Sequence, residues 1–175
     1  MEFPIFEYFP DPIGNGCMVE KNGSCPCCEQ DRAVMYVGPI YCVDDVSEVC
    51  PWCIADGSAA AKWSASFNDL YNIPDGVPQH VVRTIDSRTP GYSTWQGNTW
   101  LFSENDALVF VGEVIGSAIV RKSETEKINA CRNALVDWNF PSDFDLSNVV
   151  IGGQPAIYLF QDKETAEYRA YADMT

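Results

Sequence analysis

Histidine is scarce in this chain, since His80 is the only one among 175 residues. A metal site built on several histidines is therefore excluded, and a Ser-His-Asp or Cys-His arrangement would have to use His80 itself. His80 lies in "VPQHVVRTI", early in a predicted helix, where we expect an exposed or capping side chain. Phosphate-binding motifs are also missing, because "GPIYCVDD" and "VIGGQP" match neither glycine-rich pattern.

Basic residues are few: the chain has 11 Lys and Arg but 25 Asp and Glu, which gives a formal charge of −14. Such a surface repels phosphate backbones, so we expect no direct binding of nucleic acid. A cationic protein is the more plausible partner, because complementary fields speed and select association. Solubility alone is the other explanation for the same charge.

Long apolar runs are absent, so we expect no membrane span. The first residues, "MEFPIFEYFPDP", have no basic residue before the apolar ones and no small-residue cleavage site, unlike a secretory signal. The expected location is therefore the cytoplasm, where thiols stay reduced.

Hydrophobic residues make up 46% of the chain, enough for a folded core. Residues 1–16 predict an extended arm, and "AVMYVGPIYCV" at 33–43 predicts a strand, a turn and a strand. A helix is expected to start near Cys53, and "QHVVRTIDSRT" predicts a second one that Pro90 stops.

The rest of the chain adds a buried strand, a helix and a hairpin. "ALVFVGEVI" predicts the strand, and "SETEKINACRNALVDWNF" predicts the helix, with Ser123 and Glu126 as a capping box. "PAIYLFQDKETAEYRAYADMT" predicts a C-terminal β-hairpin. The expected fold is α+β, with antiparallel strands, flanking helices and a module in residues 1–67 packed against residues 68–175 as one compact domain.

Seven of the eight cysteines lie between residues 17 and 53. A disulfide framework is the least favoured explanation in a reducing compartment. A thiol-disulfide oxidoreductase that uses Cys50 and Cys53 is a stronger alternative, because Cys-x-x-Cys before a helix can have a lowered thiol pKa.

The favoured explanation is a metal site that uses two Cys-x-x-Cys pairs, Cys25 with Cys28 and Cys50 with Cys53. Four thiolates suit a structural Zn²⁺ in a zinc-ribbon-like module, with no coordination position left for catalysis. Cys27 is the spare thiol, because its neighbour Cys28 is too close in sequence to form such a turn with it.

Two acidic groups are candidate partner-binding surfaces. Their residues are Asp44, Asp45 and Glu48 in the first, and Asp137, Trp138, Asp143, Phe144 and Asp145 in the second. Aromatic side chains ringed by carboxylates suit a cationic protein, although a solvated loop over a few core aromatics explains the same pattern. Trp95 and Trp100, in "TPGYSTWQGNTW", are expected in the core.

Several segments together resemble the CbrC family of bacterial proteins: "FPIFEYFPDPIGNG", "SCPCCEQ", "YVGPIYCVDDVSEVCPWCIADGSAAAKW", "RTPGYSTWQGNTWL" and "FVGEV". The resemblance covers most of the chain and implies a cytosolic protein with a cysteine cluster and no assigned activity. The family is named for a member associated with colicin tolerance. Many members carry further Cys and His residues near the C-terminus that this chain lacks, so it looks like a divergent member.

Acidity, the resemblance and the lack of a catalytic set together predict an immunity-type protein rather than an enzyme. Such a protein would bind and neutralise a bacterial toxin, and a cationic nuclease toxin fits the charge. The alternatives are the oxidoreductase named above and a zinc-ribbon adaptor in a bacterial stress response.

Overall fold

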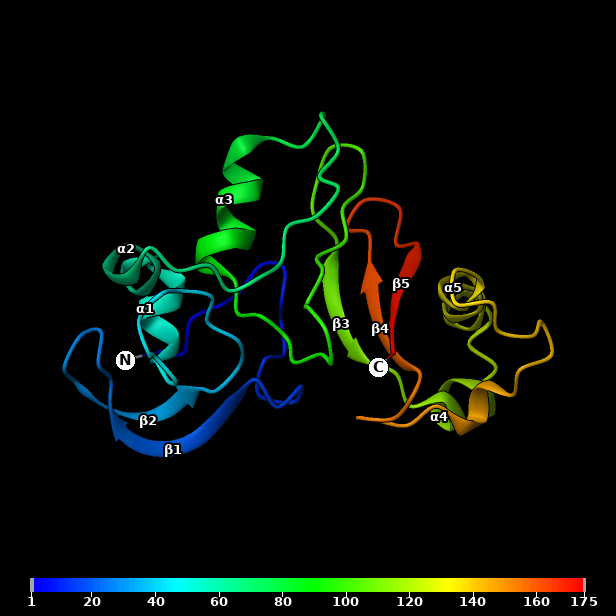
Figure 1. Ribbon diagram of the computed structural model, residues 1–175, viewed down its shortest axis with the longest axis horizontal. Helices are drawn as coiled ribbons and strands as arrows, with labels where there is room; N and C mark the ends of the chain where they lie inside the picture. Colours follow the sequence, from blue (N-terminus) through cyan, green and yellow to red (C-terminus); the bar gives the residue numbers. More distant parts are fainter. Residues whose placement is uncertain (1, 175) are drawn as a thin grey trace. The chain divides into compact units, whose positions relative to one another are not determined.

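The computed structural model describes residues 2–174 and divides the chain into two compact units. Unit 1 comprises Met1–Ser93 and Gly97–Ala107, and unit 2 comprises Thr94–Gln96 and Leu108–Thr175. Each unit combines antiparallel strands with flanking helices, so the α+β class predicted from the sequence is confirmed (Figure 1). The boundary expected after residue 67 falls inside unit 1.

Unit 1 contains a hairpin of β1 (Met18–Ser24) and β2 (Asp31–Tyr36), which pair antiparallel from Met18↔Tyr36 to Ser24↔Asp31. Of the strand, turn and strand predicted at residues 33–43, the first strand is confirmed as part of β2, but the second strand is wrong. Tyr36 donates its hydroxyl to the Pro39 carbonyl at 2.7 Å, which ties down the turn, and the chain beyond it forms only an isolated bridge, Tyr41↔Ser66. The strand therefore pairs with the segment before it.

Three helices complete unit 1: α1 (Pro51–Ala55), α2 (Ser58–Trp63) and α3 (Gln79–Arg88). The helix predicted near Cys53 is present but is split in two, because Gly57 adopts a left-handed conformation with φ 81°. The described part of the arm, residues 2–16, has no helix or strand, as predicted, yet Phe6, Tyr8 and Phe9 are buried in unit 1.

Unit 2 is a three-stranded sheet in the order β3 (Val109–Glu113), β4 (Ala156–Gln161) and β5 (Tyr168–Asp173). The buried strand and the C-terminal hairpin predicted from the sequence are both confirmed. Helix α5 (Thr125–Val136) packs against β5 and β4 through Cys131, Leu135 and their neighbours, and α4 (Gly116–Arg121) packs against the short 3₁₀ helix η1 (Leu146–Asn148).

The predicted capping box at the start of α5 is wrong. Ser123 has φ 55°, and the N-cap is Glu124, whose side chain makes no capping hydrogen bond. The turn that leaves α4 places Ser123 in this left-handed conformation, whereas a capping serine is normally extended. Glu124 instead pairs with Lys127 at 3.0 Å.

No helix among residues 2–174 combines the length and the apolar character that a membrane crossing requires.

Candidate metal centre

The first pair of cysteines lies in the connection between β1 and β2. The Cys25 amide donates to the Gln30 carbonyl at 2.9 Å, and the Glu29 amide donates to the Cys25 carbonyl at 2.7 Å. Glu29 closes this turn with φ 57°. The tight connection places the thiols of Cys25 and Cys28 on the same side of the hairpin end.

The second pair lies at the start of α1. Cys50 is the N-cap residue, Pro51 occupies the first turn, and the Cys53 amide donates to the Cys50 carbonyl at 3.1 Å. Proline is favoured at this helix position because its missing N–H would have no partner there. One helical turn therefore brings the thiols of Cys50 and Cys53 together.

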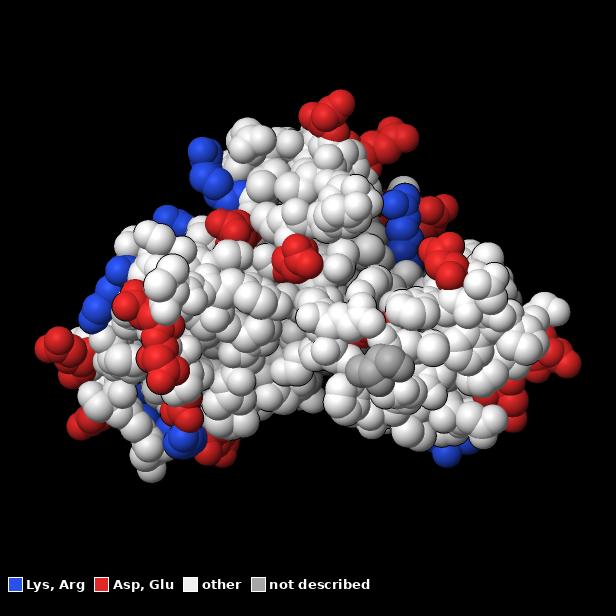
Figure 2. Space-filling view, in the orientation of Figure 1, with Lys and Arg blue, Asp and Glu red and all other residues white. Residues whose placement is uncertain are grey.

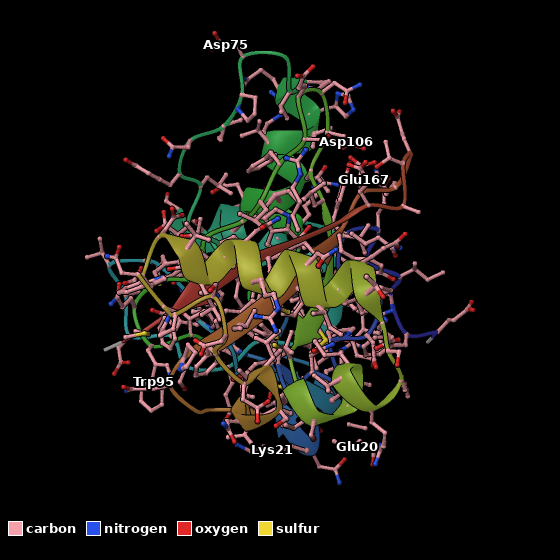
Figure 3. The ribbon with its side chains drawn as sticks, turned by 90° about the vertical axis from the view of Figure 1, so that its right-hand side faces the viewer. Glu20, Lys21, Asp75, Trp95, Asp106 and Glu167 are labelled. Atoms are coloured by element: carbon pink, nitrogen blue, oxygen red, sulfur yellow. The ribbon has the colours of Figure 1, made fainter. Side chains whose placement is uncertain are left out.

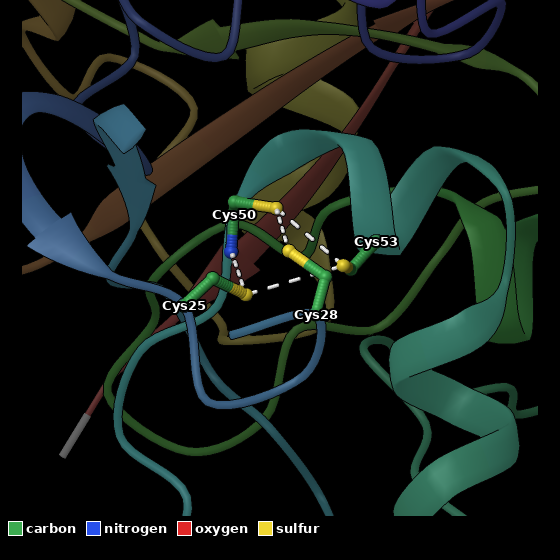
Figure 4. A group of neighbouring side chains, drawn as sticks. All are labelled: Cys25, Cys28, Cys50 and Cys53. Carbon is green, nitrogen blue, oxygen red and sulfur yellow. Dashed lines mark hydrogen bonds between the residues drawn. The ribbon is translucent and has the colours of Figure 1, made fainter. Parts of the chain in front are cut away.

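The structure brings together the same four thiols that the spacing predicted, and their ligand atoms all lie within 4.8 Å of one another (Figure 4). The Sγ–Sγ distances are 3.9 Å for Cys25–Cys53, 3.8 Å for Cys28–Cys50 and 3.5 Å for Cys50–Cys53. Bonds of about 2.3 Å from a tetrahedral zinc ion would separate sulfurs by about 3.8 Å. All four cysteines are free thiols, so this group could hold a metal ion.

Two donors next to the cluster favour thiolate over thiol. The Cys50 amide donates to Cys25 Sγ at 3.2 Å, and Arg32 Nη2 lies 3.9 Å from Cys28 Sγ. The Arg32 guanidinium also lies 4.7 Å above the Trp52 ring, which holds it at the edge of the cluster. The sequence analysis missed both Arg32 and Trp52, because neither has a spacing that relates it to the cysteines.

The pKa values of the cluster differ with position. Burial raises the pKa of Cys28, but hydrogen bonds with the Gln30 backbone, Cys53, Arg32 and Cys25 outweigh it and lower the pKa to about 7. Burial raises the pKa of Cys50 to about 11 and also raises the pKa of Cys53. The lowered pKa expected for a redox pair at a helix start is therefore absent from Cys50. A bound cation would shift all of these values.

Cys27 lies outside the set of four. Its thiol lies 3.6 Å from the Ser58 hydroxyl, and Ser58 in turn donates to the Cys53 carbonyl at 3.4 Å. Cys27 is therefore a half-buried free thiol next to the four clustered ones.

The first predicted acidic group, Asp44, Asp45 and Glu48, lies in the connection between Tyr36 and α1. Asp44 and Asp45 are exposed, while Glu48 pairs with Lys21. All three acids line a pocket of about 580 Å³ that also includes Trp63. In the view of Figure 2, Asp and Glu side chains are scattered over the surface rather than gathered in a single patch.

The carboxylates of the second predicted group follow α5. Asp137 and Asp143 are exposed, whereas Asp145 is the N-cap of η1 and accepts from the Ser147 amide at 2.9 Å. The side-chain and backbone hydrogen bonds with Ser147 lower the pKa of Asp145. This carboxylate therefore has a local structural role.

The aromatic residues of this loop are partly buried. Phe140 and Phe144 meet edge to face at 4.8 Å and pack against the core of unit 2. Trp138 is 37% exposed and donates its indole N–H to the Ala172 carbonyl at 3.1 Å. A pocket of about 400 Å³ lies beside both phenylalanines, between the end of α5 and the loop.

Two predictions about single side chains had different outcomes in "TPGYSTWQGNTW". Trp100 is buried at 1% exposure, as predicted, but Trp95 is 52% exposed and lies at the periphery in Figure 3, so the prediction of a core position for it is wrong. The buried Asp173 carboxylate accepts from the backbone amides of Trp95 and Gln96 at 2.8 and 3.0 Å. These hydrogen bonds fix the backbone of Trp95, and its indole ring is exposed at the surface. His80 is exposed in the first turn of α3, as expected.

Comparison with known proteins gives a family match over nearly the whole chain. A family model described as "Uncharacterised protein family (UPF0167)" matches residues 3–174. This chain belongs to the UPF0167 family. UPF0167 proteins of Mycobacterium bovis and Mycobacterium tuberculosis are each 36% identical over 178 residues, which cover 98% of this chain and 94% of the relative. A UPF0167 protein of Pseudomonas aeruginosa is 38% identical over 161 residues, which cover 90% of this chain and 89% of the relative.

No solved structure matches this UPF0167 chain. The matches establish a bacterial family and carry the name UPF0167, not the name CbrC that the sequence analysis suggested.

Proposed function

We propose that this protein is a cytoplasmic, zinc-stabilised binding protein that neutralises a cationic bacterial toxin, with a nuclease as the best-fitting class. The observation that carries the proposal is the loop after α5, where the exposed Asp137 and Asp143 share a stretch of chain with a pocket lined by Phe140 and Phe144. A formal charge of −14 favours a basic partner. The colicin-tolerance association of the CbrC family, which the sequence resembles, supports a toxin as that partner.

Zinc is the metal we propose for the four thiols. Four sulfur donors at tetrahedral separations suit Zn²⁺, and hard cations such as Mg²⁺ and Ca²⁺ prefer oxygen. Bound there, zinc would supply no chemistry beyond cross-linking. Cys25 and Cys28 hold the end of the β1–β2 hairpin, and Cys50 and Cys53 hold the start of α1, so the ion would join these two elements of unit 1.

The pocket beside the loop has the composition of an interface anchor site. Phe140, Phe144 and Leu135 form its apolar wall, and Arg132 lies at its rim with Nη1 donating to the Ser142 carbonyl at 2.6 Å. The exposed Asp137 and Asp143 lie in the same stretch of chain. An apolar anchor inside a polar rim is the usual anatomy of a binding hot spot.

The oxidoreductase and the stress-response adaptor remain alternatives. An oxidoreductase needs a nucleophilic thiolate in the Cys50–Cys53 pair, and burial raises the pKa of both thiols in the metal-free protein. Metal analysis with thiol alkylation separates these functions. We expect about one zinc per chain, with Cys50 unreactive until a chelator is added. Rapid alkylation of Cys50 in the untreated protein would favour the redox function.

The binding proposal is tested by reversing charges in the loop. We expect Asp137→Lys with Asp143→Lys to weaken binding to purified nuclease-toxin domains and to flatten its salt dependence. Asp145 is left intact in this variant, because it caps η1 and its loss would disturb the local fold. Titration at low and high ionic strength measures both effects.

The matched control is Glu20→Lys with Glu164→Lys, which makes the same charge change on exposed residues outside the loop. If the two double variants bind equally well, the loop does not form the interface. The acidic connection with Asp44, Asp45 and Glu48 would then be the next surface to test.

A further inference from the structure

A pocket of about 610 Å³ opens on one side of the thiol cluster. Cys27, Cys28 and Cys53 line it, together with Arg32, Trp52 and Asp56. Cys25 and Cys50 are fully buried and do not line it. The cluster therefore has one face toward the interior of unit 1 and one face that a small molecule can reach through the pocket.

Cys27 is the only pocket thiol outside the set of four. It is half-buried, and its thiol lies 3.6 Å from the Ser58 hydroxyl, which in turn donates to the Cys53 carbonyl at 3.4 Å. Ser58 therefore connects a fifth thiol to one of the proposed ligand residues, and both cysteines line the accessible pocket.

We propose that Cys27 is an oxidation site through which a hydroperoxide opens the metal centre by forming a Cys27–Cys53 disulfide. The inference rests on the proposed metal site for its consequence, which is loss of the ion. The oxidation chemistry itself depends only on the positions of the two thiols and the pocket.

The reaction has two steps. The Cys27 thiolate attacks one oxygen of hydrogen peroxide, so an S–O bond forms, the O–O bond breaks, and Cys27 becomes a sulfenic acid, while the leaving hydroxide takes up the proton that the thiol had released and departs as water. Cys53 sulfur then attacks the sulfenic sulfur, so an S–S bond forms, the S–O bond breaks, and a second water leaves. Two thiols are oxidised to one disulfide while one hydroperoxide is reduced, and Cys53 can no longer act as a thiolate ligand.

Geometry selects Cys53 rather than Cys28 as the second thiol. Adjacent residues have Cα atoms about 3.8 Å apart across a trans peptide bond, shorter than the roughly 4.4–6.8 Å that disulfides span. A Cys27–Cys28 bond would therefore be strained, whereas Cys53 lies on a different element, α1, and lines the same pocket as Cys27.

Charge selects a neutral oxidant. Four thiolates around a divalent ion carry a net charge of about −2, and Asp56 adds another negative charge at the pocket. Arg32 at the pocket and Lys62, which donates to the Pro26 and Cys27 carbonyls, offset two of these three charges, so the net charge stays negative. A small neutral hydroperoxide can therefore enter more readily than an anionic disulfide such as oxidised glutathione.

The experiment treats the zinc-loaded full chain with hydrogen peroxide, follows released zinc with a chromogenic chelator, and maps disulfides by mass spectrometry. The variant is Cys27→Ser, which keeps a hydroxyl next to Ser58, and circular dichroism checks its fold. The matched control is Cys42→Ser, which removes a half-buried thiol outside the cluster. A parallel arm uses oxidised glutathione at the same concentration.

We expect a Cys27–Cys53 disulfide in the wild-type chain, zinc release slowed about tenfold or more by Cys27→Ser, and wild-type rates for Cys42→Ser. Equal release from Cys27→Ser, or a disulfide that joins Cys50 to Cys53 instead, would overturn the proposal. Faster release with oxidised glutathione would overturn the assignment of a neutral oxidant. If the untreated chain holds no zinc, the proposed metal centre fails, while disulfide mapping still decides whether Cys27 is the oxidation site.

Discussion

At the scale of single residues, Cys53 contacts two of the other thiols of the cluster. It is 3% exposed, and its Sγ lies 3.9 Å from Cys25 Sγ and 3.5 Å from Cys50 Sγ. Cys27 does not belong to the set of four, although Cys27 and Cys53 line the same pocket. These positions predict different consequences for the same substitution at the two sites.

We predict that Cys53→Ser loses the bound metal and lowers the free energy of unfolding by more than about 4 kcal/mol, as expected for loss of a structural metal. Cys27→Ser should keep the metal and change stability by less than about 1 kcal/mol. Zinc content and denaturant unfolding measure both effects. Metal loss in Cys27→Ser, with retention in a Cys25 or Cys28 variant, would show that the wrong thiol was assigned.

At the scale of elements, the turn of the β4–β5 hairpin depends on one carboxylate. Asp162 Oδ1 accepts from the Glu164 amide at 2.8 Å and from the Thr165 amide at 2.9 Å. The backbone hydrogen bond with Thr165 is the main reason that the pKa of Asp162 lies below its ordinary value of 3.8. The ionised side chain therefore stabilises the turn.

We predict that Asp162→Ala lowers the stability of unit 2 by about 1 kcal/mol at neutral pH, because two amides lose their acceptor. The folded-state pKa is lowered, so the stabilisation is present above pH 3.8 and is lost as the pH falls through the folded value. Unfolding of the variant and the wild type as a function of pH measures the difference. Glu164→Ala in the same turn is the control, and a difference that persists in strong acid would contradict the ionised-acceptor explanation.

At the scale of the whole molecule, the chain has two units, each with its own buried residues. The four thiols all belong to unit 1, where they connect β1, β2 and α1. The core of unit 2 is formed by α5 and the β3–β4–β5 sheet and includes none of these four thiols. Removal of a bound metal should therefore act on one unit more than on the other.

We predict that a zinc chelator speeds amide hydrogen exchange in β1, β2, α1 and α2, and leaves exchange in β4, β5 and α5 nearly unchanged. The physical reason is that the ion would cross-link β1, β2 and α1 through the four thiols, whereas the sheet of unit 2 carries none of these ligands. Hydrogen exchange with mass spectrometry resolves the two sets of peptides. Equal acceleration in both units would contradict this prediction.

The sequence was informative wherever a local pattern decides the structure. The i, i+3 spacing of each cysteine pair fits within one turn, so Cys25 with Cys28 and Cys50 with Cys53 could be matched before any fold was known. The alternation and length of apolar runs likewise determined β3 and the β4–β5 hairpin, because strand patterns have a short period. Charge and composition needed no structure at all.

Only the tertiary structure decided which distant groups meet. It paired β2 with β1 rather than with the segment after Pro39, left Trp95 exposed while its backbone amide binds Asp173, and started α5 after Ser123 instead of at a capping box. It also placed Arg32, Trp52 and Cys27 around the four thiols. These outcomes depend on burial and hydrogen bonding between residues far apart in sequence, and a local pattern in one segment does not contain its partner.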